Sequence, residues 1–249
     1  MMRWMATLAI ILPVPALAGA WPQPLEHGLS ISSVGYASGA NGGDRVLFDS
    51  YAEAGMGDGF TAVFSFESEL ASGMAMYGWR AGGGLRFSLE PETASPWLFS
   101  IETRISYQDY GSAIGDPVFA GDGTGAAIQF DAGRAFQIGG MHGFANVSAG
   151  WSWRGNTSDE WRINAVAGLD LSESWQIGAG YFSTYAPGEL YDPGVYEKHE
   201  AQVSLRWKID ADYALALSAA QTISADRAPE ETTLRLSLWT FLYPEPDDD

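Results

Sequence analysis

The stretch that decides the fold is WLFSIETRISYQ, residues 97–108. Its odd-numbered positions are apolar or aromatic, apart from Thr103, and its even positions from Ser100 onward are Ser, Glu, Arg or Gln. Successive side chains of a β-strand point to opposite faces, so the pattern predicts a strand with one apolar and one polar face. Because an aromatic residue also stands at each end of the apolar row, such a strand is typical of a wall between lipid and a polar lumen.

The first twenty residues have the features of a secretory signal peptide. Arg3 provides a positive start, residues 5–14 form an apolar run, and small residues follow at 16–20. We expect cleavage after Ala18 or Ala20 and leave this segment out of the fold. The apolar run is shorter than the roughly 20 residues that a membrane helix needs.

Composition restricts the functional class. The chain carries 31 Asp and Glu against 13 Lys and Arg, a formal net charge of −18, which argues against binding nucleic acid. It has no Cys, so we expect neither a disulfide framework nor an N-terminal lipid anchor. The 30 Gly, 10 Trp and 11 Tyr are unusual for a soluble domain and favour a β-barrel of an outer membrane.

The alternating pattern recurs along the whole mature chain. Strand-like segments are expected at 28–38, 45–56, 59–69, 75–90, 97–109, 125–137, 142–154, 160–171, 175–186, 197–209, 213–223 and 232–243. We therefore predict an all-β fold: a transmembrane, antiparallel, up-and-down barrel of about twelve strands over residues 21–243, without a plug domain. Residues 244–249 are expected to form an acidic periplasmic tail.

Connection lengths alternate in the way that such a barrel requires. Short turns are expected near 56–58, 91–96, 138–141, 172–174 and 210–212, and the alternate connections include the long ones at 110–124, 187–196 and 224–231. If both termini lie in the periplasm, the short turns fall on the periplasmic side and the long loops outside.

The apolar faces carry aromatic residues near both strand ends. We expect one aromatic girdle near the periplasmic edge from Phe60, Phe87, Trp97, Phe136, Phe144, Trp175, Trp207 and Tyr213, and a second near the outer edge from Tyr77, Trp79, Tyr107, Trp151, Trp153, Trp161 and Tyr185. Amphipathic rings favour lipid–water boundaries, so the two girdles frame an aliphatic band.

The polar faces carry charges of both signs together with many Gly and Ser. The residues predicted to line the lumen are Glu67, Arg80, Arg86, Glu102, Arg104, Asp131, Arg162, Asp170, Arg206, Lys208 and Arg235, with Asp49, Glu53, Glu69, Arg154, Lys198, Glu200 and Asp210 at the same parity. Two interpretations remain open: a charge-lined passage for small polar solutes, or a network of ion pairs that fills a small barrel. The small residues leave room and favour the passage.

Two local features fit this pattern poorly. Within residues 29–36 the apolar residues shift from odd to even positions, as they would at a β-bulge. Arg134 takes outward parity, which requires that it lie at the membrane interface or that the register there be different.

The alternative fold is a soluble β-sandwich or lipocalin-like barrel, in which the apolar face would be the core. Three features favour lipid instead. The polar face has small residues and Arg where a solvated surface would carry many Lys and Glu, aromatic residues gather at strand ends, and connection lengths alternate.

Taken together, the signal peptide, the girdles, the hairpins and the last strand, LRLSLWTFLY at 234–243, resemble the outer-membrane β-barrels of Gram-negative bacteria. The Trp21-Pro22 start and the Gly-rich hairpins look like uncharacterised barrels of alphaproteobacteria. The resemblance implies a location in the cell outer membrane, contact with its lipid and lipopolysaccharide, and insertion by the barrel-assembly machinery. It implies no particular cargo.

We therefore expect a narrow porin-like channel and no enzyme, cofactor or metal site. The loop at 115–125 has Asp-Gly pairs but lacks the bidentate Glu of a known calcium loop. One alternative is a closed structural barrel whose loops 110–124 and 187–196 meet a partner. A more remote alternative is an outer-leaflet hydrolase at His199, which has Glu197 and Glu200 beside it but no diagnostic Ser spacing.

Overall fold

A computed structural model of the chain describes residues 21–39, 43–71, 77–89, 97–110, 123–154, 158–188 and 195–242. The predicted signal peptide, the acidic tail and most of the loops 110–124 and 187–196 lie outside these ranges. Among the described residues, no helix has the length and apolar character needed to span a membrane.

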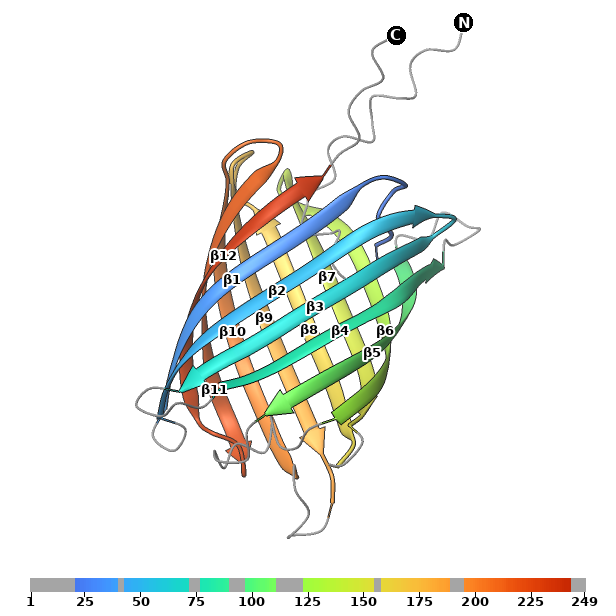
Figure 1. The fold of residues 1–249 in the computed structure, drawn as a ribbon. Coiled ribbons are helices and arrows are strands. Elements are labelled where there is room, and N and C mark those ends of the chain that lie inside the picture. Colours follow the sequence, from blue (N-terminus) through green and yellow to red (C-terminus); the bar gives the residue numbers. More distant parts are fainter. Residues whose placement is uncertain are drawn as a thin grey trace, which may run out of the picture.

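Twelve antiparallel strands close into a barrel in which each strand pairs with its neighbours in sequence and β1 pairs with β12 (Figure 1). The strands are β1 (Gly28–Gly39), β2 (Gly43–Gly57), β3 (Phe60–Ala71), β4 (Tyr77–Leu89), β5 (Trp97–Tyr110), β6 (Gly123–Ile138), β7 (Met141–Trp153), β8 (Glu160–Asp170), β9 (Trp175–Ala186), β10 (Tyr196–Lys208), β11 (Tyr213–Asp226) and β12 (Glu231–Leu242). The predicted fold class is confirmed.

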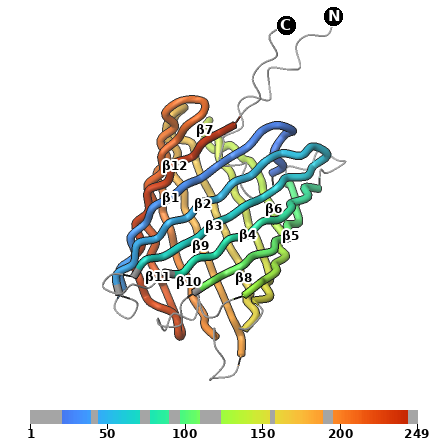
Figure 2. The backbone as a smooth tube through the Cα atoms, in the orientation of Figure 1, coloured from blue at the N-terminus to red at the C-terminus, as the bar shows by residue number. Residues whose placement is uncertain are grey.

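The barrel has two different ends. The chain enters β1 and leaves β12 at one end, here named the terminus end, and the opposite end is named the loop end (Figure 2). Short turns at 58–59, 139–140, 171–174 and 209–212 join strands at the terminus end. Gly139 and Gly140 both have positive φ, of 58° and 86°, which a two-residue hairpin of this kind requires and which glycine adopts without strain.

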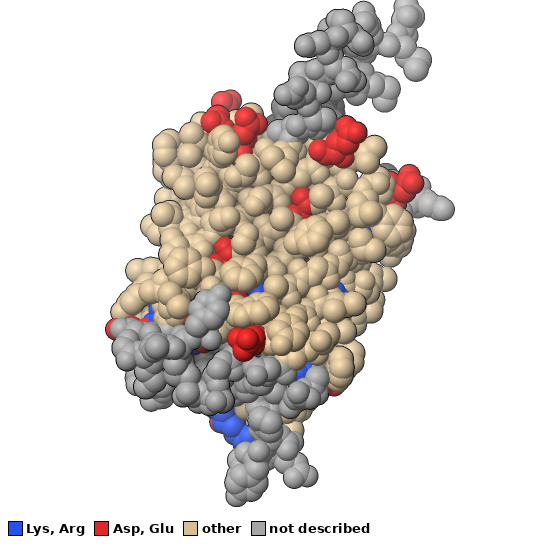
Figure 3. Space-filling view, in the orientation of Figure 1, with Lys and Arg blue, Asp and Glu red and all other residues tan. Residues whose placement is uncertain are grey.

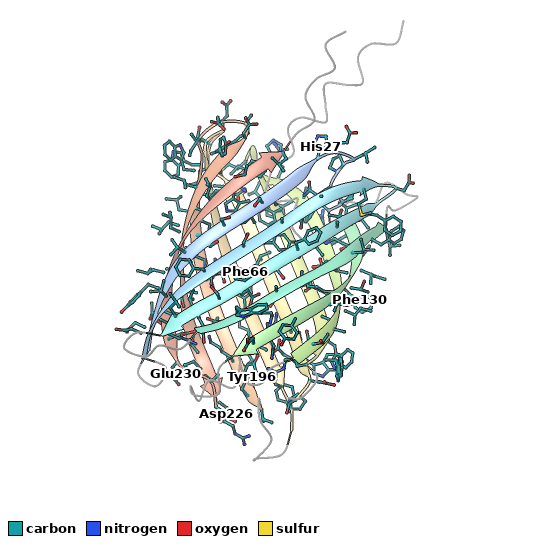
Figure 4. All side chains as sticks on the ribbon, viewed as in Figure 1. His27, Phe66, Phe130, Tyr196, Asp226 and Glu230 are labelled. Atoms are coloured by element: carbon teal, nitrogen blue, oxygen red, sulfur yellow. The ribbon has the colours of Figure 1, made fainter. Side chains whose placement is uncertain are left out.

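Apolar side chains form the outer face. On β10, Val203 faces outward and is 63 % exposed, whereas Arg206 faces inward and is buried. Figure 3 shows an outer wall that is uncharged over most of the face in view, and in Figure 4 Phe66 and Phe130 stand on the outside of the barrel. A barrel with an apolar wall of this kind is suited to lipid rather than water.

Aromatic rings gather at both ends of this outer face. Phe60 and Phe87 lie 4.8 Å apart, ring centroid to ring centroid, at the terminus end, and Trp79 and Tyr107 lie 5.6 Å apart toward the loop end. Of the predicted girdle, the exposed members are Phe60, Phe87, Trp97, Tyr107, Trp153, Trp161, Trp175, Tyr185, Trp207 and Tyr213, the half-buried ones are Trp79, Phe136 and Trp151, and the side chain of Tyr77 lies outside the described part. Phe144 is different: it is buried inside the lumen.

The predicted bulge in β1 is wrong. The pairing of β1 with β2 and with β12 runs from Gly28 to Gly39 without a shift. Leu29 faces inward and packs with Ala214 and Phe241. Val34, further along the strand, is exposed on the outer wall. The parity changes because the lumen is apolar at the terminus end, not because the strand is irregular.

Arg134 keeps its outward position in a regular register. It is the direct partner of Trp97 across β5 and β6, and its guanidinium carbon lies 5.7 Å from the centre of that ring. Because Trp97 begins β5 at the terminus end, Arg134 lies at the boundary of the apolar band, where a long side chain can reach water.

Candidate functional site

A cavity of about 540 Å³ lies in the lumen and is here named the main chamber. Side chains of β1–β3 and β8–β12, and one from β5, line it. Its charged residues are Arg45, Asp49, Glu67, Glu69, Arg104, Arg162, Lys198, Glu200, Glu231 and Arg235. Basic and acidic residues are equal in number, so the charges of the wall nearly cancel, and Ile31, Leu47 and Phe182 add apolar surface.

A smaller cavity of about 70 Å³ lies against β3–β8. It shares with the main chamber the side chains of Ser65, Glu67, Arg104 and Arg162. The last three are here named the junction. Their side chains are 39 %, 27 % and 38 % exposed, respectively, so each of them has free surface toward the lumen.

Each junction arginine is held by a buried carboxylate. Arg104 pairs with Glu102, and Arg162 pairs with Glu160. Because Glu102 and Glu160 have almost no exposed surface, they fix the positions of the guanidinium groups from behind, while the junction arginines keep their free sides in the lumen.

Both carboxylates also bind a second arginine. Glu102 Oε2 lies 2.8 Å from Arg86 Nη2, and Glu160 Oε2 lies 3.6 Å from Arg154 Nη1. Arg154 follows β7 just outside the strand, and burial lowers the pKa of its guanidinium while Glu160 opposes that shift. Glu160 is thus shared by two guanidinium groups, whereas Arg86 is shared between Glu102 and Glu53.

Arg86 is the centre of a buried network near the terminus end. Its Nη1 donates to Glu53 Oε1 at 2.7 Å and its Nη2 donates to the Tyr51 hydroxyl, also at 2.7 Å. The Tyr51 hydroxyl donates to the same oxygen of Glu53 at 2.5 Å. Together with Glu102, these groups join β2, β4 and β5 across the inner wall.

A second network lies toward the loop end of the main chamber. Arg45 contacts Glu231 and lies 3.1 Å from Glu69, nitrogen to oxygen. Lys198 Nζ lies 2.7 Å from Glu231 and 3.3 Å from Glu200. The network therefore links β2 and β3 with β10 and β12 on both sides of β1.

The residues that precede β1 enter the lumen at the terminus end. Residues 21–27 are here named the lead-in segment. Trp21 is only 5 % exposed and packs with Phe144, and Leu98 and Val166 pack against this pair. Gln23 is also buried: its backbone nitrogen donates to Thr61 Oγ1 at 3.1 Å and its side-chain amide donates to Glu53 Oε2 at 2.8 Å.

The predicted lumen residues are thus located as follows. Glu67, Arg80, Glu102, Arg104 and Arg162 line the cavities, as does Arg235, which lies 3.0 Å from Asp49. Arg86, Asp131 and Arg206 are buried nearer the terminus end, with Asp131 beside Gln129 and the Arg206 guanidinium 5.2 Å from the Trp239 ring. Asp170 is half-buried and accepts a hydrogen bond from Gln176. Lys208, at the last position of β10, is exposed and does not line either cavity, because the strand ends there.

Sequence reasoning missed three charged residues at strand ends. Arg45 and Glu160 are not among the predicted lumen residues, and Glu231 falls in the expected loop 224–231; all three are buried inside the barrel. The signal that could have found them is parity: each lies an even number of residues from a lumenal charge of its own strand, Asp49, Arg162 and Arg235 respectively.

His199 stands apart from the lumen. It faces outward on β10, where its Nε2 lies 2.7 Å from Glu197 Oε1 and its Nδ1 lies 2.9 Å from the Tyr181 hydroxyl. The rings of Tyr181 and His199 are stacked. Both imidazole nitrogens are therefore engaged on the outer wall of the barrel. Within the described ranges, no group of three or more His, Asp or Glu side chains is placed to hold a metal ion.

Comparison with known proteins gives matches of fold. No family model and no curated protein matches the sequence. Solved structures do match. An outer-membrane channel from Pseudomonas putida F1 has a TM-score of 0.57 at 12% identity, over 88% of this chain and 96% of that one. The NanC porin has a TM-score of 0.59 at 10% identity, over 86% and 100%.

The fold is that of an outer-membrane β-barrel. A third solved structure, LpxR from Salmonella typhimurium, has a TM-score of 0.56 at 13% identity, over 86% of this chain and 100% of that one. The first two structures are described as a channel and a porin. At these identities the likeness establishes only the fold. The function has to be inferred from the residues of the lumen and of the outer wall.

Proposed function

We propose that the protein is a narrow outer-membrane channel that admits small polar solutes at its loop end. The observation that carries the proposal is the main chamber, a polar space of about 540 Å³ inside a barrel with an apolar outer wall. The likeness in fold to two channels supports it. In this proposal the termini are periplasmic, lipopolysaccharide surrounds the loop end, and the barrel-assembly machinery inserts the chain.

The junction is the proposed selectivity filter. Arg104 and Arg162 present free guanidinium surface to both cavities, and Glu67 is the carboxylate that shares the junction with them. Rings of basic side chains favour anions in pores. We therefore propose a preference for solutes that carry a carboxylate or another anionic group.

Electrical recording in planar bilayers tests the channel. The chain starting at residue 21 and a chain starting at residue 25 are both reconstituted, because the lead-in segment lies in the lumen. We expect discrete channel events with chloride preferred over potassium, and a lower chloride-to-potassium permeability ratio for the Arg104→Gln/Arg162→Gln variant. Arg134→Gln, on the outer wall, is the matched control and should leave the ratio unchanged. Correctly inserted protein without channel events from either chain would contradict the proposal.

A second candidate function is hydrolysis of an outer-leaflet lipid at His199. Glu197, His199 and Tyr181 form a hydrogen-bonded chain on the outer wall, an arrangement in which a carboxylate orients an imidazole and the imidazole can accept a hydroxyl proton. The test is mass spectrometry of lipids released from lipopolysaccharide-containing vesicles. Release that persists in His199→Ala, or no release from the unaltered chain, would dispose of this candidate. An inserted barrel with neither activity would favour the structural barrel with a loop partner.

A further inference from the structure

The lead-in segment crosses the lumen from one wall to the other. Gln23 is bound to Thr61 on β3 and to Glu53 on β2, whereas Trp21 packs against Phe144 on β7. In the closed order of twelve strands, β2 and β7 lie on nearly opposite sides of the ring. Two residues of one short segment thus contact opposite walls at the terminus end.

The wall of the barrel is shaped to receive this segment. A Cβ atom at Gly55 of β2 would lie 1.8 Å from the Pro24 carbonyl oxygen, so only glycine permits the segment to lie against the strand here. The backbone nitrogen of Gly55 donates to the His27 carbonyl at 2.9 Å. The pairing of β2 with β3 also shifts at this point, between Gly55 and Gly57.

The same segment stands outside the sheet. Residues 21–24 belong to no strand, and two hydrogen bonds of Gln23 go to side chains, those of Thr61 and Glu53. Withdrawing these four residues therefore breaks no pairing between strands, and the barrel can stay closed while the lumen opens.

We propose that residues 21–24 are a gate that closes the channel at the terminus end and opens it by leaving the lumen. This inference rests on the proposed channel function. Closing the end opposite the loops leaves the main chamber accessible to solutes only from the loop end, so that passage through the barrel depends on the release of Trp21 and Gln23.

The gate is connected to the junction by continuous contacts. Gln23 binds one oxygen of Glu53, and Arg86 binds the other. Arg86 also binds Glu102, which holds Arg104 at the junction. An anionic solute that draws Arg104 away from Glu102 would change the charge balance around Arg86 and Glu53, and this is the route by which the solute would loosen Gln23.

Single-channel recording tests the gate with two variants. The chain starting at residue 25 lacks the gate, and the variant Trp21→Ala/Gln23→Ala retains the length of the segment but loses its buried contacts. We expect brief, infrequent openings for the unaltered chain and an open fraction at least tenfold higher for both variants. Leu25→Ala is the matched control, because Leu25 belongs to the lead-in segment but its side chain is exposed.

The outcomes separate this inference from the proposed function. If the unaltered chain and both variants conduct with the same open fraction, the gate is refuted and the channel stands. If none of them conducts after confirmed insertion, removal of the segment does not open the lumen, and both proposals fail.

A reversible lock provides a second measurement that does not depend on deleting residues. The chain has no native Cys, so Gln23→Cys/Thr61→Cys places the only two thiols where the segment meets β3. We expect the oxidised form to show no openings and reduction with dithiothreitol to restore them. Equal currents before and after reduction of a verified disulfide would overturn the gate.

Discussion

Several charged side chains inside this barrel are buried and paired with one another. Arg86 is almost fully buried and is matched by Glu53, Glu102 and the Tyr51 hydroxyl. Removing one member of such a group leaves the others uncompensated, which costs far more than the ion pairs contribute. The networks thus fix the positions of the junction arginines, while part of the surface of Arg104 and Arg162 stays exposed to the lumen.

The first prediction concerns this buried arginine. Arg86→Gln should lower the free energy of unfolding by roughly 3–5 kcal/mol, because the buried Glu53 loses its counter-ion and Glu102 keeps only Arg104. Arg134→Gln, which loses only an exposed contact with Trp97, should cost about 1 kcal/mol or less. Urea titration of the barrel in detergent, read by the gel shift between folded and unfolded forms, measures both. Equal losses would refute the assignment of Arg86 to a buried network.

For single residues, the sequence predicts which side chains face the lumen in the middle of a strand, but not at the ends of a strand. Alternation from Glu102 and Arg104 was enough to predict inward charges in the middle of the strands. It was not extended to Glu160, the first residue of the expected strand 160–171, or to Glu231, which lies just before the expected strand 232–243. Which arginine pairs with which carboxylate depends on the register between neighbouring strands, and this register cannot be derived from the alternating pattern of one sequence.

Each strand has one face toward lipid and one toward the lumen. The same substitution at two neighbouring residues of a strand should therefore have opposite effects on the stability of the barrel. On β10, Val203 faces outward and Gln202 lines the main chamber. The rule holds even for β1, where the apolar Leu29 faces inward at the terminus end. The apolar character of a residue indicates its face only where the lumen is polar.

The second prediction uses this pair. Val203→Arg should reduce the stability of the barrel in bilayers by roughly 2–4 kcal/mol, because the charge would meet lipid. Gln202→Arg should be tolerated, since its side chain enters a polar cavity. Refolding into phosphatidylcholine vesicles across a urea series compares the two. The account fails at this point if Gln202→Arg is the more damaging change.

The third prediction tests the regular register of β1. Leu29→Ala should cost roughly 2–5 kcal/mol, because Leu29 is buried against Ala214 and Phe241 and the change leaves a cavity. Val34→Ala, on the outer wall, should cost less, since lipid can fill the space. A bulge of the kind that the parity change suggests would place both side chains on the outer wall, and the two losses would then be similar in the same unfolding assay.

The molecule as a whole is a closed wall around a divided lumen. Alternation, girdles and connection lengths predicted the wall from sequence. They could not predict the gate, because its two contacts, Gln23 with β2 and β3 and Trp21 with β7, come together only when the ring closes. A short segment with no alternating pattern has no signal that places it inside rather than outside.

The account depends most on which side of the wall meets lipid. The measurement that tests this directly uses single cysteines at positions 202, 203, 204 and 205 in a chain without native Cys, each labelled with a fluorophore and reconstituted in bilayers containing nitroxide lipids. We predict strong quenching at 203 and 205 and weak quenching at 202 and 204. Strong quenching at 202 and 204, with 203 and 205 protected, would show that the barrel is inverted and would contradict the account.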